Sequence, residues 1–148
     1  MRIGINALSA GNRSGTGRYT EQLLRALARI DQKNNYVLCV REHSPLLAQL
    51  GRHDNFEVEP VAGNGPGRIH LFERFGLRRW IARHGLDIFH GPAFFIPPAC
   101  PVPSVVTVHD LVFMLYPETV PLSRRYYYRR AFPRSIAEAT LVFADSDS

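Results

Sequence analysis

The chain has 148 residues, a length that fits one domain with a sizeable core. Its 45% apolar and 21% charged residues are typical of a folded globular protein and exclude a disordered chain. The formal charge of +5 favours anionic partners, such as phosphates or an acidic membrane surface. No apolar run approaches the roughly 20 residues of a membrane span, and the N-terminus lacks a long apolar signal segment, so we expect a cytoplasmic protein.

Cysteine and histidine spacing argues against several kinds of site. Cys39 lies in an apolar run, where we expect a buried thiol, and Cys100 lies in a proline-rich segment, so neither a disulfide framework nor a zinc site is expected. The six histidines show no metal-ligand spacing such as His-x-x-x-His. We find no helix-turn-helix, zinc-finger or RNA-binding signature, so nucleic acid is not an expected partner.

Apolar periodicity predicts alternating strands and helices in the first half of the chain. Residues 3–5 suit a buried strand, and a glycine-bearing loop leads to a helix over residues 19–30. A second buried strand is expected over 36–40 and a short helix over 44–50. Residues 56–60 alternate as a strand that Pro60 assigns to an edge or an end of the sheet.

The second half continues the alternation. We expect a helix over 69–84 that Gly76 bends or splits, a short strand over 87–90, an extended proline-rich loop over 92–103 and a strand over 104–108. The last predicted elements are a loop over 111–120, a helix over 123–139 bent at Pro133, a buried strand over 141–144 and the start of a further helix at 145–148.

This alternation predicts the α/β class: a Rossmann-like, doubly wound parallel sheet with helices on both faces. Ligands of such sheets bind outside the carboxyl ends of the strands, near the switch in strand order. The features that fall at such ends are the glycine loop of residues 11–17, His90-Gly91-Pro92 and His109-Asp110.

The glycine loop is a candidate phosphate site. Gly15, Thr16 and Gly17 stand where a strand gives way to a helix, and a helix start offers unpaired N–H groups and the positive end of a dipole. Thr20 occupies the position of the third glycine of a dinucleotide fingerprint. The alternative interpretation is therefore a tight strand–helix turn without a ligand.

His109 is the best single candidate for chemistry, because an imidazole can both donate and accept a hydrogen bond at a sugar hydroxyl. The alternative is a histidine that ties down the end of its strand. Asp110 suits either a substrate hydroxyl or an anchor for the following loop, whereas His90 suits a structural role better than a catalytic one.

Two aromatic segments are candidate binding surfaces. Phe94 and Phe95 stand in the rigid proline loop on the expected ligand side, where they could line an acceptor site. A basic run alternates with tyrosines and reads as a helix with core tyrosines and a solvated arginine face, or as a contact with an anionic membrane. Its arginines are Arg124, Arg125, Arg129 and Arg130.

Several stretches in order resemble the N-terminal domain of a family 4 glycosyltransferase with the GT-B architecture. They are MRIGINA (1–7), SGTGRYT (14–20), DIFHGP (87–92) and PSVVTVHDL (103–111), followed by YYYRR (126–130) and ATLVFADS (139–146). The resemblance implies that residues 1–148 are a single N-terminal, acceptor-side domain. It also implies that the C-terminal domain with most nucleotide-sugar contacts is absent from this chain, which is then inactive alone.

The resemblance further implies a retaining transfer of a sugar from a nucleotide-sugar donor to a glycan or lipid-linked acceptor, with no metal or other cofactor. By position, Gly15, Thr16 and Gly17 would approach the donor diphosphate, and His109 would lie by the donor sugar. The resemblance implies that Asp110 joins His109 as a catalytic residue and lies toward the acceptor, whose side would comprise His90, Gly91, Pro92, Phe94 and Phe95. A cytoplasmic or peripheral position at the inner face of the membrane follows, in a polysaccharide-building role.

Two other classes of function are compatible with the sequence. One is a dinucleotide-binding domain of the oxidoreductase type, although Val40 at the end of the second strand is followed by Arg41 and only then by an acidic residue, Glu42. The other is a non-catalytic module that docks an anionic membrane or a partner through its basic helix.

Overall fold

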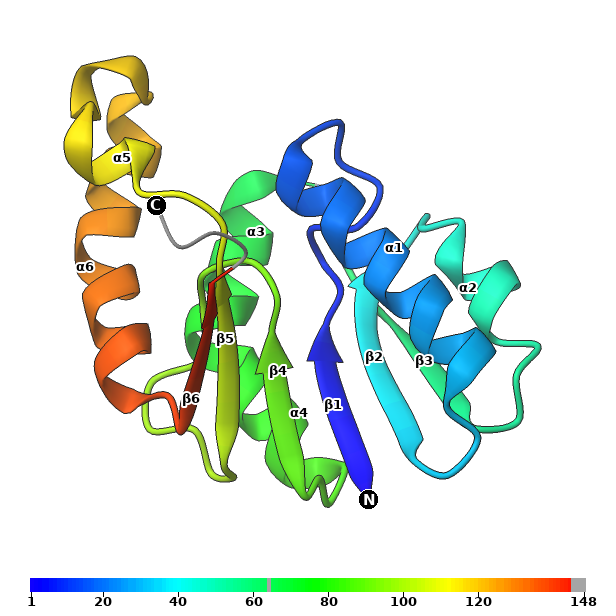
Figure 1. Cartoon of the computed structure of the whole chain (residues 1–148). Coiled ribbons are helices and arrows are strands. Elements are labelled where there is room, and N and C mark those ends of the chain that lie inside the picture. The colour runs from blue at the N-terminus through cyan, green and yellow to red at the C-terminus, as the bar shows by residue number, and fades with distance from the viewer. Residues whose placement is uncertain (64, 145–148) are drawn as a thin grey trace.

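A computed structural model of the chain describes residues 1–63 and 65–144, apart from the side chains of residues 66, 123, 124, 126 and 127. These residues form a six-stranded sheet in the order β3-β2-β1-β4-β5-β6, and every pairing is parallel (Figure 1). The strands are β1 (Arg2–Asn6), β2 (Asn35–Arg41), β3 (Phe56–Val61), β4 (Ile88–Gly91), β5 (Ser104–Val108) and β6 (Leu141–Ala144).

Helices lie in most of the connections between the strands. They are α1 (Gly15–Ile30), α2 (Leu46–Leu50), α3 (Pro66–Leu71), α4 (Leu77–Arg83), α5 (Val112–Leu115) and α6 (Leu122–Glu138), with a π-helical turn η1 (Phe72–Gly76) and a 3₁₀ turn η2 (Pro117–Thr119). The Rossmann-like expectation is confirmed, because this strand order is that of doubly wound nucleotide-binding folds.

The two faces of the sheet carry separate cores. Along β2, Tyr36, Leu38 and Val40 pack with α1 and α2, whereas Val37 and Cys39 pack on the opposite face with α3, α4 and the end of α6. Successive strand residues point to opposite faces, so a fully apolar strand must be covered on both sides. The buried position of Cys39 also confirms the expectation of a buried thiol.

Pro60 lies in β3, the outermost strand on its side of the sheet, as predicted. An edge strand tolerates proline because a missing N–H on the open side costs no sheet hydrogen bond. β6 forms the other edge, and here the prediction of a buried strand was wrong. Leu141 and Phe143 are 49% and 48% exposed. The prediction failed because an apolar run in the sequence does not show whether another element covers it.

Some predicted boundaries also change. Residues 111–120 were expected to be a loop, but they contain α5 and η2: Asp110 accepts the amide of Val112 and Pro117 opens the 3₁₀ turn. The helix expected from 69 begins at Pro66, and η1 continues it through Gly76 instead of breaking it. The expected helix start at 145–148 lies outside the described residues. Among the described helices, none combines the length and apolarity that a membrane span requires.

Candidate active site at the carboxyl edge of the sheet

From β1 the chain continues to β2 and β3 on one side of the sheet, and from β4 it continues to β5 and β6 on the other. The switch in strand order therefore lies between the neighbours β1 and β4. In open α/β sheets, the crevice beyond the carboxyl ends of such a strand pair is the usual ligand site. Because all the strands are parallel, their carboxyl ends lie together along one side of the sheet, the carboxyl edge. The start of α1 and the segment before α5 both lie at this edge (Figure 1). The sequence-predicted features therefore share one edge, as expected.

The glycine loop enters α1 through a defined N-cap. The Ser14 hydroxyl accepts the amide of Gly17 at 3.2 Å, and its carbonyl accepts that of Arg18. In the described part of the chain, the amides of Gly15 and Thr16 have no hydrogen-bond acceptor. Two N–H donors thus remain at the positive end of a 16-residue helix, which is the chemistry of an anion site.

Gly17 is required for packing against the loop. A Cβ added there would lie 2.6 Å from the Asn12 carbonyl oxygen and 2.7 Å from that of Ser9. Gly15 is different, because its Cβ would meet nothing within 4 Å. Thr20, at the place of the missing third glycine, is fully buried, and its hydroxyl donates to the Thr16 carbonyl and contacts Ser9 Oγ at 2.9 Å. It holds the loop against the helix.

His109 follows β5, and its ring contacts Pro92, Tyr19 and Phe94. Its Nε2 lies 2.8 Å from the Pro92 carbonyl oxygen, which can only accept, so Nε2 carries the hydrogen. Its ring meets Tyr19 edge-on at 4.6 Å and Phe94 edge-on at 5.4 Å between centroids. In the neutral ring, Nδ1 is then the hydrogen-bond acceptor. The structure thus brings His109 to the start of α1, through Tyr19.

Asp110 is exposed, and its carboxylate accepts the amide of Val112 at the start of α5. This is the loop-anchoring position that the sequence left as one of two options. His90 lies deeper. Its Nε2 is 2.8 Å from Thr107 Oγ1, and burial, with a smaller contribution from the charge of His109, lowers its pKa to about 4. At neutral pH His90 is an uncharged imidazole that ties β4 to β5.

The turn after β4 is tightly constrained. A Cβ on Gly91 would collide with the Phe95 carbonyl oxygen, so the position requires glycine. Phe94 has φ 70°, a left-handed conformation that costs a bulky residue about 1–3 kcal/mol, and its amide donates to the Thr107 carbonyl at 3.1 Å. Strain of this kind persists only where the surroundings impose it, and it is concentrated at functional sites.

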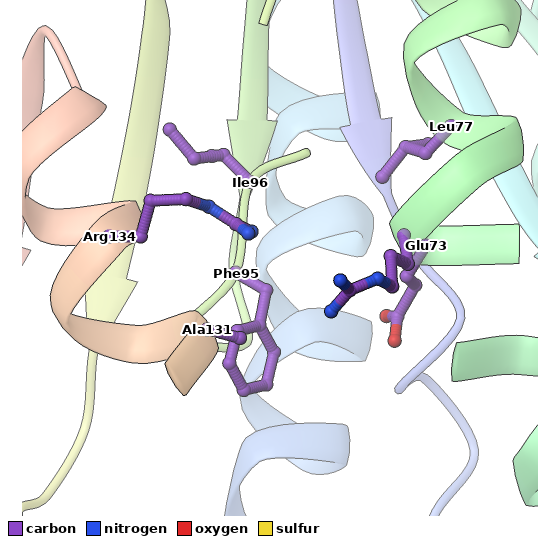
Figure 2. Close-up of a pocket in the computed structure, with 7 residues that line it drawn as sticks. Glu73, Leu77, Phe95, Ile96, Ala131 and Arg134 are labelled. Carbon is purple, nitrogen blue, oxygen red and sulfur yellow. The ribbon is translucent and has the colours of Figure 1, made fainter. Parts of the chain in front are cut away.

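Phe94 and Phe95 expose little of their side chains to a ligand. Both are over 90% buried in an aromatic cluster with Phe113 and Phe132, which packs the proline loop against α5 and α6. Phe95 also lines a small pocket, shown in Figure 2, between η1 and α6. Stacking on Tyr128, with 5.3 Å between centroids, fixes its ring.

The basic helix is only partly as predicted. Tyr128 belongs to the aromatic cluster, which confirms a core tyrosine, and Arg129 and Arg130 are exposed, while Arg125 is half-buried. The side chain of Arg124 lies outside the described residues. Arg129 lines a second pocket of about 270 Å³ between α5 and α6, together with Phe113, Met114, Pro117, Tyr128 and Pro133.

Sequence reasoning missed the partners that position the site. Tyr19 was assigned only to the apolar stripe of its helix, and Thr107 only to a strand. Their contacts to His109 and His90 join segments far apart in sequence, and the one local signal was Tyr19 standing two residues after Gly17. Across the described residues, no group of three or more His, Cys, Asp or Glu side chains could hold a metal ion.

Comparison with protein-family models finds glycosyltransferase family 4, matched over residues 13–148. The chain belongs to this family. Comparison with curated proteins and with solved structures finds no match. A family 4 domain acts in glycosyl transfer and therefore handles a sugar donor and an acceptor. The match begins just before the Ser14 cap and includes both the glycine segment and His109 of this glycosyltransferase domain.

Proposed function

We propose that this domain is the acceptor-side half of a retaining GT-B glycosyltransferase that moves a sugar from a nucleotide-sugar to a glycan or lipid-linked acceptor. The observation that carries the proposal is the convergence of His109 with the start of α1 through Tyr19. It joins a group able to bind a sugar hydroxyl to amides able to bind a phosphate. The family match favours this function over a dinucleotide-dependent oxidoreductase.

The amides of Gly15 and Thr16, with the backbone of Gly17, are assigned to the donor diphosphate. Cleavage of a sugar–phosphate bond leaves negative charge on the diphosphate, and preorganised N–H donors stabilise that charge without reorganising. The helix dipole adds to this effect. We therefore expect transfer without a metal ion or another cofactor, so that activity persists in the presence of a chelator.

His109 is assigned to the transferred sugar. The bond from Nε2 to the Pro92 carbonyl fixes the ring, and Nδ1 of the neutral imidazole has the lone pair to accept from a sugar hydroxyl. Asp110 and the segment from His90 to Phe95 lie on the acceptor side of this assignment. Their role is to shape the edge of the site, since Phe94 is buried and His90 is half-buried.

A second α/β domain, carried on the same polypeptide, is proposed to bind the nucleotide. It would close over the carboxyl edge of this sheet, where Gly15 and His109 lie. In this proposal the 148 residues alone bind acceptor or phosphate weakly and transfer no sugar.

The test is a transfer assay on the parent enzyme with a panel of nucleotide-sugars and extracted glycan and lipid acceptors. His109→Ala is expected to lower kcat about 100-fold or more, the effect of removing one preorganised hydrogen-bonding group, with an unchanged circular dichroism spectrum. His53→Ala, on the surface loop before β3, is the matched control. Equal turnover of the His109→Ala variant and the parent would remove His109 from the site, and no transfer from any nucleotide-sugar would reject the proposed reaction.

A peripheral position on an anionic membrane is also proposed, because one observation favours it. Met114 and Leu115 of α5 are 51% and 69% exposed, and Leu122 at the start of α6 is 79% exposed. Exposed Arg129 and Arg130 follow on α6. Apolar side chains beside arginines match the composition of a bilayer interface with acidic headgroups.

A further inference from the structure

A small pocket lies beside the site described above, between η1, the chain after β4 and α6 (Figure 2). Its lining residues are Glu73, Arg74, Leu77, Phe95, Ile96, Ala131 and Arg134. Its volume is about 10 Å³, which admits roughly one water-sized group. Two arginines from elements about sixty residues apart therefore line a space of the size of one oxygen atom.

Arg134 reaches the pocket from α6 and is poorly paired (Figure 2). Its Nε is buried and, among the described residues, has no hydrogen-bond partner. The nearest carboxylate oxygen, Oε1 of Glu138, is 3.9 Å away, beyond hydrogen-bond distance. An unsatisfied buried donor on a charged group costs more than a neutral one, so a bound acceptor would stabilise this arrangement.

The two neighbouring carboxylates already have other partners. Glu138 Oε2 accepts the amide of Ala99 at 2.9 Å. Glu73 accepts from Asn6 Nδ2 with one oxygen, and its other oxygen lies 3.3 Å from His70 Nδ1. The pocket lining therefore contains one acidic residue and two arginines, and the balance of charge there is positive.

The wall of the pocket is held in place before any ligand arrives. The amide of Ile96 donates to Ser135 Oγ at 3.2 Å, and the same hydroxyl donates to the Ala131 carbonyl at 2.9 Å. Ser135 is fully buried. This pair of bonds fixes the chain after β4 against α6, and stacking on Tyr128 fixes Phe95. A preorganised wall lowers the cost of ordering on binding.

We propose that this pocket is a subsite for a phosphoryl group, held between Arg74 and Arg134. Guanidinium groups bind phosphate through charge-assisted, bidentate hydrogen bonds. A tetrahedral phosphoryl group presents oxygens in several directions, so it can place one oxygen in the pocket and serve two arginines. A planar carboxylate is matched by a single guanidinium fork.

The position of the subsite suggests its source, and this step rests on the proposed function. Asn6 at the carboxyl end of β1 contacts Glu73 of the lining, and Phe95 follows β4, so the pocket borders the switch point at the ligand edge of the sheet. The donor diphosphate is assigned to the start of α1. The subsite therefore takes a phosphate carried by the acceptor, as in a lipid-linked phosphate or a phosphorylated glycan.

The subsite is tested first on the 148-residue chain with inorganic phosphate, followed through the arginine Nε–Hε signals in nitrogen–proton correlation spectra. We expect a saturable shift of the Arg134 signal and about tenfold or more weaker phosphate binding in Arg74→Gln and Arg134→Gln. Arg78→Gln, an exposed arginine on α4, is the charge-matched control and should bind as the parent does. Acetate should shift the signal far less.

No saturable shift, or equal phosphate binding by all three variants, would overturn the subsite. If Arg134→Gln does not fold, Arg134→Lys replaces it, since lysine keeps the charge and loses the fork. The source is tested in the parent enzyme: Arg134→Gln should raise the acceptor KM about tenfold while the donor KM stays within about twofold. An unchanged acceptor KM in an active enzyme refutes the acceptor role. An enzyme that transfers no sugar refutes the proposed function, and the phosphate titration then decides the subsite alone.

Discussion

The ring of His109 meets the ring of Tyr19 edge-on, with 4.6 Å between their centroids and 70° between their planes. Ninety residues of chain separate them, yet the contact connects the end of β5 with the second turn of α1. Edge-to-face pairs are favourable because the positive edge of one ring meets the negative face of the other. The contact therefore fixes His109 relative to the amides that precede Tyr19.

Tyr19 is predicted to be a positioning residue. Tyr19→Leu should cost about 1 kcal/mol of stability through the lost ring pair and should lower kcat of the parent enzyme more than it raises either KM. Tyr19→Phe keeps the ring and should have the stability and the kcat of the parent. The measurements are urea unfolding of the chain and steady-state kinetics of the enzyme. Equal kinetics for Tyr19→Leu and Tyr19→Phe would show that the contact serves stability alone.

Gly91 should be irreplaceable in the turn after β4. Gly91→Ala places a methyl group against the Phe95 carbonyl, so we expect a loss of about 3 kcal/mol in the free energy of unfolding, the upper range for overpacking. Gly67→Ala is the matched control, because a Cβ there meets nothing within 4 Å and α3 favours alanine. Thermal unfolding compares the two, and a Gly91→Ala chain as stable as the parent would contradict the steric argument.

His90 should make stability depend on pH. Its folded pKa of about 4 lies below the ordinary value of 6.5, so the unfolded chain binds a proton in this range that the folded chain does not. Stability is therefore full above pH 6.5 and falls as pH drops toward 4, by about 3 kcal/mol from this group. Urea unfolding from pH 4 to 7 should show this slope in the parent and a reduced slope in His90→Asn. Parallel profiles of unfolding free energy against pH for the parent and His90→Asn would contradict this role of His90.

The tip formed by α5 and the start of α6 should bind anionic vesicles. We expect the chain to sediment with phosphatidylglycerol-containing vesicles and to ignore pure phosphatidylcholine, since arginines contribute only at a charged surface. Replacing Met114 and Leu115 by Ser should weaken binding about tenfold or more, because two apolar side chains lose their insertion energy.

The control for that experiment is Ile30→Ser, which removes an apolar side chain that is 77% exposed at the far end of α1. It should leave vesicle binding unchanged. Arg129→Gln should weaken binding to anionic vesicles, and more so at low salt, where screening is least. Binding that is insensitive to the replacements at positions 114, 115 and 129 would show that this tip is not the membrane contact.

Local patterns were sufficient for most of the fold. The strand over 104–108 has the bounds predicted for it, and Pro60 indicated correctly that β3 is an edge strand. Residues 19–30 are helical as predicted, although Ile30 of their apolar stripe is exposed. These features depend on neighbours in the chain. The first turn of α1 was missed, because helix propensity is low across Gly15-Thr16-Gly17. The Ser14 cap, which accepts the Gly17 amide, favours a helix start there.

The alternation of elements, the glycine loop and the candidate histidines could be read from the chain alone, because side-chain period, glycine and proline act through local backbone geometry. Packing in three dimensions determines which candidates meet: His109 with Tyr19, His90 with buried Thr107, and Arg134 with Arg74 at one pocket. It also buried Phe94 and left β6 exposed. Burial and pairing across tens of residues depend on how helices pack on the sheet, and no local period encodes that.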